Sequence, residues 1–313
     1  MKPIVTLTLN PTIDGASEAE VVRPTHKIRT TTEAYDPGGG GINVTRVIKE
    51  LGGESIAVYL AGGSTGGVLD DLLGSRAIAR RRIPIAGNTR VSHLVYERST
   101  GLEYRFIPEG PEVSERECQR CLMALEDLDW EWMVASGSLP RGVPDDFYTR
   151  LIDMAAARKG KFVLDTSGEP LRLALQHGGV TLVKPSQGEF EKFVGRKLET
   201  PKDIGAAAEV EIAAGRAEMF AITLGDQGAV LSTREGTMHL AAPKVEVKST
   251  SGAGDSFVAG MVHALAIGWR PEDAFRLGIA AGTAAVLSTG TQLCRRVDVD
   301  RLYGEIRRVS GPF

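Results

Sequence analysis

The chain has 313 residues, of which 42% are hydrophobic and 25% charged, and a formal net charge of −3. This composition supports a large core, and the length fits one α/β domain with an added element, or two domains. The small net charge excludes a global basic field that would recruit nucleic acid or an acidic membrane surface, so local groups must hold any anionic ligand.

The N-terminal segment and the cysteines give no sign of secretion. The segment MKPIVTLTLN is typical of a buried strand and has no signal-peptide pattern, and no apolar run approaches the roughly 18 residues of a membrane helix. Cys118, Cys121 and Cys294 are too few and odd in number for a disulfide framework. A lone C-x-x-C on a predicted helix does not indicate zinc. A reducing cytoplasm is the simplest interpretation.

Strand and helix patterns alternate along the chain. In order, they predict strand 4–9, helix 41–51, strand 55–60, helix 114–128, strand 132–135, helix 144–158, strand 162–165, strand 180–183, helix 204–214, strand 219–224, and helices 255–266 and 271–287. This alternation predicts a doubly wound, mainly parallel α/β sheet with helices on both faces. Ligands are then expected at the carboxyl ends of the strands.

Two segments, approximately 16–36 and 89–107, break this rhythm. Both show strand-like alternation without a helix between them, as in RVSHLVYE and LEYRF. They predict a small second sheet that projects from a single domain spanning 1–313. Because an exposed sheet can pair with another copy, a homodimer through this sheet is expected. The basic run RAIARRR at 76–82 is interpreted as solvated surface.

The stretch SGAGDSFVAG at 251–260 places Gly252, Ala253 and Gly254 directly before Asp255 and a helical pattern. Glycines let the backbone turn tightly against a ligand, and a helix start offers unpaired N–H groups. Such a turn can hold a phosphate whose charge grows during transfer. An isolated Asp at this position could instead only stabilise the helix.

A second glycine-rich stretch, DPGGGGINVTRVIKELGG at 36–53, also enters a helix. Gly39 and Gly40 can bring main-chain N–H groups against a small polar ligand, and Asn43 can donate and accept hydrogen bonds. Asp14 follows the first strand and could grip hydroxyl groups or simply form a turn. The Lys-Ser/Thr ending of a P-loop and the dinucleotide-binding glycine spacing are both missing from the sequence.

Seven segments together resemble the ribokinase-like, phosphofructokinase-B family of ATP-dependent sugar kinases. In chain order they are PGGGGINVTRVIKELGG, SGSLPRGV, LDTSGE, LVKPSQGEF, ITLGDQGAV, STSGAGDSFVAG and AAGTAAVLSTGTQLC. The match follows the family's order and runs from about Ile4 to Cys294. The four glycines at 38–41, LVKP, YRF and GTQLC resemble most closely the 6-phosphofructokinase branch found in bacteria. The resemblance implies a ribokinase-like fold in which the small sheet is a lid over the sugar and pairs with a second subunit.

The resemblance also implies residue roles. Asp255 would be the general base, and the N–H groups of Gly252, Ala253 and Gly254 would stabilise the transferring phosphoryl group, which agrees with the chemistry above. By matching position, the sugar would be held by Asp14, Gly39, Gly40 and Asn43, and its phosphate by Arg90, Arg105, Ser138 and Lys27, with Lys27 reaching across the dimer. Without the resemblance, the sequence would predict that Arg90, Arg105 and Lys27 are each exposed surface cations.

The cofactors implied are ATP and Mg²⁺. ATP would lie among Lys184, Ser186, Gln187, Thr223, Gly225, Gly228, Ser249 and Thr283, and Glu189 would position Mg²⁺ through water. Ser186 departs from the family's usual asparagine and shortens the reach of that side chain. A K⁺ site is expected near Ser249, Ser251, Ala285, Ser288, Gly290 and Gln292, although Ser288 and Gln292 also depart from the close relatives.

The expected reaction is therefore phosphorylation of the C1 hydroxyl of fructose 6-phosphate by Mg·ATP, giving fructose 1,6-bisphosphate and ADP. The same chemistry on tagatose 6-phosphate or fructose 1-phosphate is the nearest alternative, because motifs do not fix pocket shape. A kinase of nucleosides or unphosphorylated sugars would leave Arg90 and Arg105 without a phosphate partner. A sugar-phosphate-binding regulator without catalysis is the alternative from another class, since fold alone does not establish activity.

Overall fold

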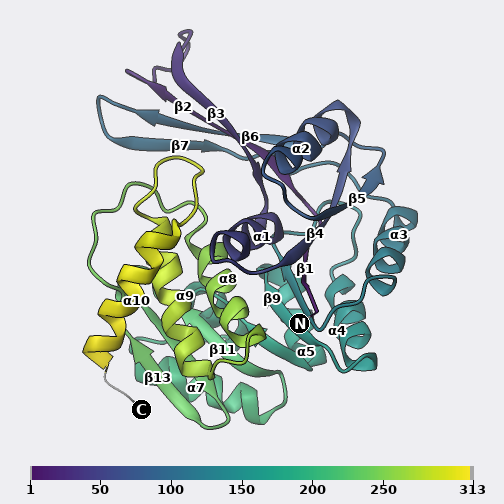
Figure 1. The fold of residues 1–313 in the computed structure, drawn as a ribbon, viewed down its shortest axis with the longest axis vertical. Coiled ribbons are helices and arrows are strands. Elements are labelled where there is room, and N and C mark those ends of the chain that lie inside the picture. Colours follow the sequence, from purple (N-terminus) through teal and green to yellow (C-terminus); the bar gives the residue numbers. More distant parts are fainter. Residues whose placement is uncertain (1, 311–313) are drawn as a thin grey trace.

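The computed structural model describes residues 2–310 and contains two sheets (Figure 1). The larger is nine-stranded, in the order β13-β12-β11-β10-β9-β8-β1-β4-β5. Its strands are β1 (Ile4–Thr8), β4 (Ser55–Gly62), β5 (Arg80–Ile85), β8 (Trp132–Ser136), β9 (Lys161–Asp165), β10 (Val180–Val183), β11 (Ala217–Thr223), β12 (Ala229–Thr233) and β13 (Gly236–Leu240). All neighbours pair in parallel except β11-β12 and β12-β13. The mainly parallel α/β sheet is confirmed.

Helices cover both faces of this sheet. One layer contains α1 (Gly40–Glu50), α8 (Ala253–Ala266), α9 (Pro271–Ala285) and α10 (Arg296–Ser310). The opposite layer contains α3 (Glu115–Glu126), α4 (Phe147–Ala157), α5 (Gly168–His177), α6 (Gln187–Val194) and α7 (Pro201–Ala213). Helix α2 (Gly63–Ser75) packs on β4 and on the second sheet. The doubly wound arrangement places the first turns of α1 and α8 at the carboxyl ends of the central strands.

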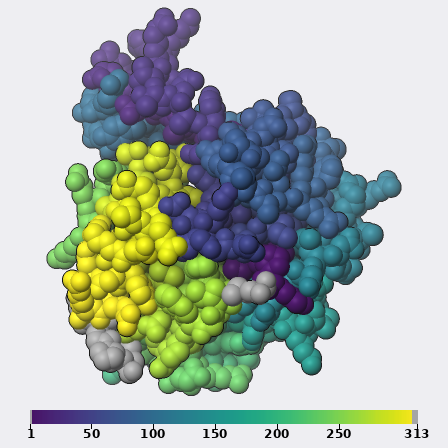
Figure 2. Space-filling view, in the orientation of Figure 1, coloured from purple at the N-terminus to yellow at the C-terminus, as the bar shows by residue number. Residues whose placement is uncertain are grey.

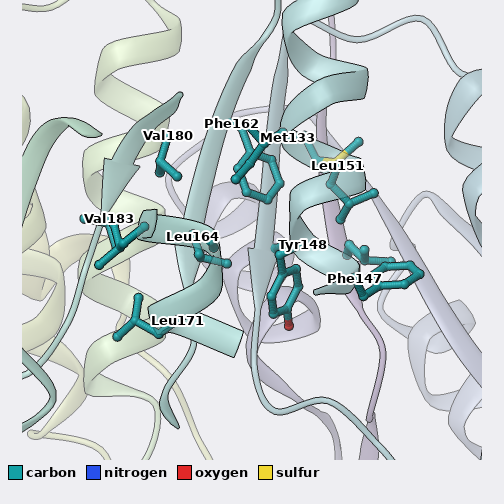
Figure 3. Close-up of a cluster of buried hydrophobic side chains, with 14 of the residues drawn as sticks. Met133, Phe147, Tyr148, Leu151, Phe162, Leu164, Leu171, Val180 and Val183 are labelled. Atoms are coloured by element: carbon teal, nitrogen blue, oxygen red, sulfur yellow. The ribbon is translucent and has the colours of Figure 1, made fainter. Parts of the chain in front are cut away.

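The core follows the two-residue period of the strands. Met133, Phe162 and Leu164 point toward α4, where Phe147 and Tyr148 meet them (Figure 3). Val134 and Val163, the next residues along β8 and β9, point to the other face and join the cluster under α8 and α9. Strands buried on both faces explain why the sequence shows continuous apolar runs here.

The second sheet contains β3 (Thr30–Gly38), β2 (Thr12–Ala19), β6 (Arg90–Glu97) and β7 (Leu102–Phe106), in that order. Strand β2 pairs antiparallel with β3 and parallel with β6, and β6 pairs antiparallel with β7. The sheet stands out from the main body (Figure 2). Strand β2 begins earlier and β3 ends later than the segment 16–36 suggested, so Asp14 lies within β2, whereas β6 and β7 lie within the expected 89–107.

Several elements escaped the sequence prediction: α2, α5, α6, α10, β5, β12 and β13. Helix α2 begins in a glycine-rich stretch and α6 has only eight residues, so neither shows a long apolar period. Residues Arg80 to Arg82 form part of β5 at the sheet edge, where their side chains stay at least partly exposed. The arginines of the run 76–82 are at least partly exposed, as expected, but Ile78 within it is buried and only its last three residues belong to a strand.

No helix within residues 2–310 is long and apolar enough to cross a membrane. The three cysteines are free and buried, Cys118 and Cys121 on α3 in one core cluster and Cys294 in the other.

Phe190 tests how α6 is anchored. Its ring is fully buried, with ring centroids 5.5 Å from Phe220 and 6.5 Å from Phe193. Phe190→Ala should lower the free energy of unfolding by about 3–5 kcal/mol, because it removes buried area and leaves a cavity. The control Val210→Ala, at an exposed position of α7, should change it by less than about 0.5 kcal/mol. Equal losses in urea unfolding would contradict this packing.

Candidate active site

The first turn of α8 begins at a glycine and offers main-chain N–H groups to a ligand. Gly252 is the N-cap residue, with a left-handed backbone (φ 68°), and a Cβ there would lie 2.3 Å from the Leu293 side chain. The first N–H groups of a helix have no intrahelical acceptor and carry the positive end of its dipole. Gly252, Ala253 and Gly254 therefore present an anion-binding surface.

Asp255 lies on this first turn and contacts the other glycine-rich helix start. Asn43, on α1, donates a hydrogen bond from Nδ2 to Asp255 Oδ2 over 2.9 Å. Loss of hydration raises the pKa of Asp255 to about 6, and the negative charge of Asp165 adds to this rise. A carboxylate with that pKa is ionised at neutral pH and still basic enough to accept a proton.

A buried ion pair joins the ends of β9 and β10. Lys184 Nζ lies 3.0 Å from Asp165 Oδ1, with both side chains largely buried. Burial is the largest influence and would lower the pKa of Lys184, but the charge and hydrogen bond of Asp165, together with the charges of Glu189 and Asp255, outweigh it and the pKa is raised. A Cβ on Gly254 would lie 3.6 Å from Lys184 Nζ, so this cation borders the anion-binding turn. Asp165 was not selected individually from the sequence, although its position at a strand end was a usable signal.

The four-glycine run lies tightly against its neighbours. A Cβ on Gly38 would lie 1.8 Å from the Asp14 carboxylate, and one on Gly40 would lie 2.2 Å from Ser136 Oγ. Gly39 has φ 107°, which disfavours a side chain. Burial raises the pKa of Asp14, partly offset by a hydrogen bond from Ser92 Oγ. The run therefore brings the α1 backbone and the Asp14 side chain into one site.

A cavity of about 410 Å³ opens beside these residues. It is lined by Asn10, Arg90, Ile107, Pro108, Glu109, Ser138, Leu139 and Arg141. Arg90 donates from its two Nη atoms to the carbonyls of Pro108 and Asn10. Within the described chain, Arg90 Nε and Asn10 Oδ1 are buried without a hydrogen-bond partner, which favours a polar ligand here. The structure thus brings Arg90 and Ser138 together and adds Arg141, which the sequence did not single out.

The other two basic residues expected at the sugar phosphate lie elsewhere. Arg105 pairs with Glu103 over 2.8 Å and donates to Thr250 Oγ1 over 3.3 Å, so β7 contacts the segment that leads to the anion-binding turn. Arg105 is not among the residues that line the cavity. Lys27 lies exposed in the loop between β2 and β3.

Ser186 has a structural role that explains its residue type. It is the N-cap of α6, and its side chain accepts a hydrogen bond from Glu189 N. The Glu189 carboxylate in turn accepts bonds from Ser186 N and Oγ, each 2.8 Å long. This capping box orients Glu189 toward the start of the helix. Gln187 donates to the Leu198 carbonyl, which fixes the chain after α6.

The remaining residues expected around a nucleotide fall into two groups. Thr223, at the end of β11, forms an isolated bridge with Ser186, and Gly225 and Gly228 bound the short 3-10 helix Gly225–Gln227. Gly228 has φ 95°, and a Cβ there would lie 2.0 Å from the Leu240 carbonyl. The second group contains Ser249, whose N–H lies 3.5 Å from the Val286 carbonyl, and Thr283, which is buried on α9.

The segments expected to hold a monovalent cation lie side by side. The amides of Lys248 and Ser249 approach the Val286 carbonyl, next to Ala285. Ser251 N donates to Ser249 Oγ, and Ser288 Oγ donates to the Leu293 carbonyl. Gly290, with φ 63°, and Gln292 lie in the turn between Ser288 and Leu293. The hydroxyl of Ser288 is therefore already engaged within its own turn.

The donor set fits the groups implied by the sequence. Asp165 and Glu189 supply hard oxygen donors, and both act electrostatically on Lys184. Mg²⁺ is usually held by one or two carboxylates together with phosphates and water, and among residues 2–310 no group of three or more His, Cys, Asp or Glu side chains forms a metal cage. The helix start at Gly252 suits phosphate oxygens.

Curated proteins are similar to this chain over nearly its whole length. The chain is 43% identical to ATP-dependent 6-phosphofructokinase isozyme 2 of Mycobacterium tuberculosis, over 96% of this chain and 88% of that protein. It is 38% identical to the Escherichia coli protein of the same description, over 98% of this chain and 100% of that one.

Solved structures agree. Escherichia coli phosphofructokinase-2 in complex with fructose 6-phosphate superimposes with a TM-score of 0.93 at 36% identity, covering 98% of this chain and 100% of that chain. Other structures of that protein are described as a complex with potassium and as a tetrameric inhibited form. Arabidopsis thaliana ribokinase, 20% identical over 96% of this chain and 98% of that one, shares the fold with a TM-score of 0.74. The model of the pfkB family of carbohydrate kinases matches residues 7–297, and the chain belongs to this family.

Proposed function

We propose that the protein is an ATP-dependent sugar-phosphate kinase that phosphorylates the C1 hydroxyl of fructose 6-phosphate, giving fructose 1,6-bisphosphate and ADP. The observation that carries this proposal is the position of Asp255 on the first turn of α8, beside free N–H groups and hydrogen-bonded to Asn43. The names of the relatives, 6-phosphofructokinase isozyme 2, support this choice of sugar.

Asp255 acts as the general base. Its carboxylate accepts the proton of the sugar hydroxyl, and its pKa of about 6 leaves it ionised at pH 7 to 8. Asp14, Asn43 and the N–H groups of Gly39 and Gly40 hold the other sugar hydroxyls. The N–H groups of Gly252, Ala253 and Gly254, with the neighbouring Lys184, stabilise the negative charge that develops on the transferring group.

ATP and Mg²⁺ are held on the other side of the anion-binding turn. Lys184, Ser186, Gln187, Thr223, Gly225, Gly228, Ser249 and Thr283 surround the nucleotide. Asp165 and Glu189 would hold Mg²⁺, Glu189 through water, and when bound the ion would neutralise phosphate charge during transfer. A K⁺ ion near Ser249, Ser251, Ala285, Ser288, Gly290 and Gln292 would add positive charge next to this turn, and the potassium complex of the Escherichia coli relative supports this part.

The cavity at Arg90 receives the phosphate of the acceptor sugar. Arg90 and Ser138 line it, and the unpaired Arg90 Nε offers a donor that a phosphate oxygen satisfies. Arg105 completes the phosphate site when the second sheet closes as a lid, which requires Arg105 to leave Thr250, and Lys27 is supplied by the second copy. Free sugars leave these donors unpaired and are poor substrates.

The outer face of the second sheet is the surface through which two copies pair. Tyr35, His93 and Phe106 form a cross-strand row on this face, and Tyr35 and Phe106 are 48% and 58% exposed. Pairing would cover these rings and bring Lys27 of one copy toward the site of the other. The free, buried cysteines suit the reducing cytoplasm in which we place the enzyme.

The product tests the reaction directly. Wild-type protein with Mg·ATP and fructose 6-phosphate should give a sugar carrying phosphate at C1 and C6, identified by ³¹P NMR. Asp255→Asn keeps an acceptor for Asn43 but cannot take the proton, so kcat should fall roughly 10²- to 10⁴-fold while both substrates still bind. Wild-type kcat/KM should fall below pH about 6, where Asp255 becomes protonated. Near wild-type turnover of the variant would remove Asp255 from this role.

Arg90 tests the phosphate cavity. Arg90→Met should raise KM for fructose 6-phosphate at least about 10-fold, since a charge-assisted hydrogen bond contributes roughly 1.5–3 kcal/mol. KM for ATP should stay within about twofold. Arg172→Met is the matched control and should change neither constant, because Arg172 lies on α5 in the opposite helix layer and, among residues 2–310, pairs only with Glu169. A rise in KM for ATP alone would place Arg90 at the nucleotide.

The pairing surface is tested by sedimentation velocity at micromolar concentration. Wild-type protein should sediment as a dimer or a multiple of it. Phe106→Glu should give monomers with reduced activity, because it places a charge where pairing would bury a ring, and Lys27 then no longer reaches the other copy. Met123→Glu, at an exposed position of α3, is the control and should leave the assembly intact. A fully active wild-type monomer would contradict the surface.

A further inference from the structure

A buried arginine lies behind the pair formed by Asn43 and Asp255. Arg46 is one turn further along α1, and its side chain is only 12% exposed. Nη1 donates to Asn43 Oδ1 over 3.1 Å and to the Pro37 carbonyl over 2.9 Å, and Nη2 donates to Asp36 Oδ1 over 3.3 Å. The planar guanidinium is thus held by three acceptors from α1 and β3.

These contacts decide which way the Asn43 amide points. An asparagine amide has a donor end and an acceptor end. Because Oδ1 accepts from Arg46, Nδ2 must face Asp255, to which it donates over 2.9 Å. If the amide were flipped, its Nδ2 donor would face the Arg46 donor and its Oδ1 would face the Asp255 carboxylate, and both contacts would be repulsive. Arg46 therefore fixes the hydrogen bond made to the base.

Arg46 also supplies charge. Four charged groups act on the Asp255 carboxylate: Asp14 on β2, Asp165 on β9, Lys184 after β10 and Arg46 on α1. Arg46 itself faces Asp36 on β3 and Arg76 at the end of α2, as well as Asp14 and Asp255. Its positive charge favours the ionised forms of Asp14 and Asp255, against the repulsion between the carboxylates.

Asp36 holds the arginine from behind. This carboxylate is buried, and it also pairs with Arg76 and accepts from Thr291 Oγ1 over 2.6 Å. Arg76 contacts Asp36 but makes no hydrogen bond to Asn43 in the described chain. The two arginines therefore share one carboxylate, and only Arg46 reaches the base through Asn43.

We propose that Arg46 is a positioning residue for the general base: it orients the Asn43 amide toward Asp255 and holds that carboxylate in its ionised form. This role rests on the proposed kinase function, in which Asp255 takes the proton. Arg46 touches neither the reacting hydroxyl nor the phosphoryl group in this account.

The test compares Arg46→Met with Arg76→Met. Asp255 is followed directly by NMR of protein labelled with ¹³C at aspartate carboxyls, with Asp255→Asn identifying its resonance. The wild-type resonance should titrate near pH 6, and Arg46→Met should move its midpoint up by at least about half a pH unit. Arg76→Met should leave the midpoint in place. An unmoved midpoint in Arg46→Met would overturn the electrostatic role.

Kinetics test the orienting role. Arg46→Met should lower kcat with fructose 6-phosphate roughly 10- to 100-fold, with the acid limb of kcat/KM shifted as in the titration. Arg46→Lys restores the positive charge, but the lysine ammonium group cannot hydrogen-bond to Asn43 and Asp36 at the same time. The Asp255 midpoint should therefore return toward pH 6 while kcat stays low. Full activity of Arg46→Lys would overturn the orienting role and leave only charge.

The two readouts separate this proposal from the proposed function. If Arg46→Met shifts the titration midpoint of Asp255 but the wild-type protein phosphorylates no sugar, the influence of Arg46 on Asp255 is upheld and the kinase assignment is refuted. If the wild-type protein is a kinase and Arg46→Met keeps both the Asp255 midpoint and kcat, the role of Arg46 is refuted and the proposed function stands. Circular dichroism of each variant checks folding, and Arg46→Lys, which retains a cation beside Asp36, serves if Arg46→Met does not fold.

Discussion

The buried pair of Lys184 and Asp165 is the interaction on which the site depends. It lies at the ends of β9 and β10, where the parallel strands converge on the start of α8. Without Lys184, Asp165 and Asp255 would be neighbouring carboxylates with little hydration, and one of them would take up a proton. With it, Asp255 keeps a pKa of about 6 and stays a usable base.

Close backbone approach is the second constraint. The glycines of α1 let its first turn lie against Asp14 from the second sheet and Ser136 from β8, while Gly252 lets α8 begin beside Leu293. Both helix starts then face the same space, joined by the hydrogen bond from Asn43 to Asp255. The site is therefore assembled from both sheets, which supports our proposal that the second sheet acts as its lid.

Much of this could be predicted from the sequence, because strands buried on both faces and glycine-rich helix starts leave strong local patterns. The strands β1, β8, β9 and β10 and the site at their carboxyl ends are examples. Lys184 was selected, but its partner Asp165 was not, since ion pairs between distant strands leave no spacing in the sequence. Arg46 and Asp36 lie in the glycine-rich stretch at 36–53, only ten residues apart, but nothing in the sequence marks them as partners or as neighbours of Asn43. The segment SQGE has the spacing of a capping box, so the capping role of Ser186 could have been predicted. The comparison with the family's usual asparagine led instead to the expectation that serine shortens the side chain.

The central claim is that this site transfers phosphate from ATP to fructose 6-phosphate. The most direct measurement is kcat/KM of the purified protein with Mg·ATP on fructose 6-phosphate, tagatose 6-phosphate, fructose 1-phosphate and free fructose, with and without K⁺. The account predicts the highest value on fructose 6-phosphate and a far lower one on free fructose. Preference for another sugar phosphate would contradict the substrate, and turnover of none would contradict the kinase in favour of a sugar-phosphate-binding regulator.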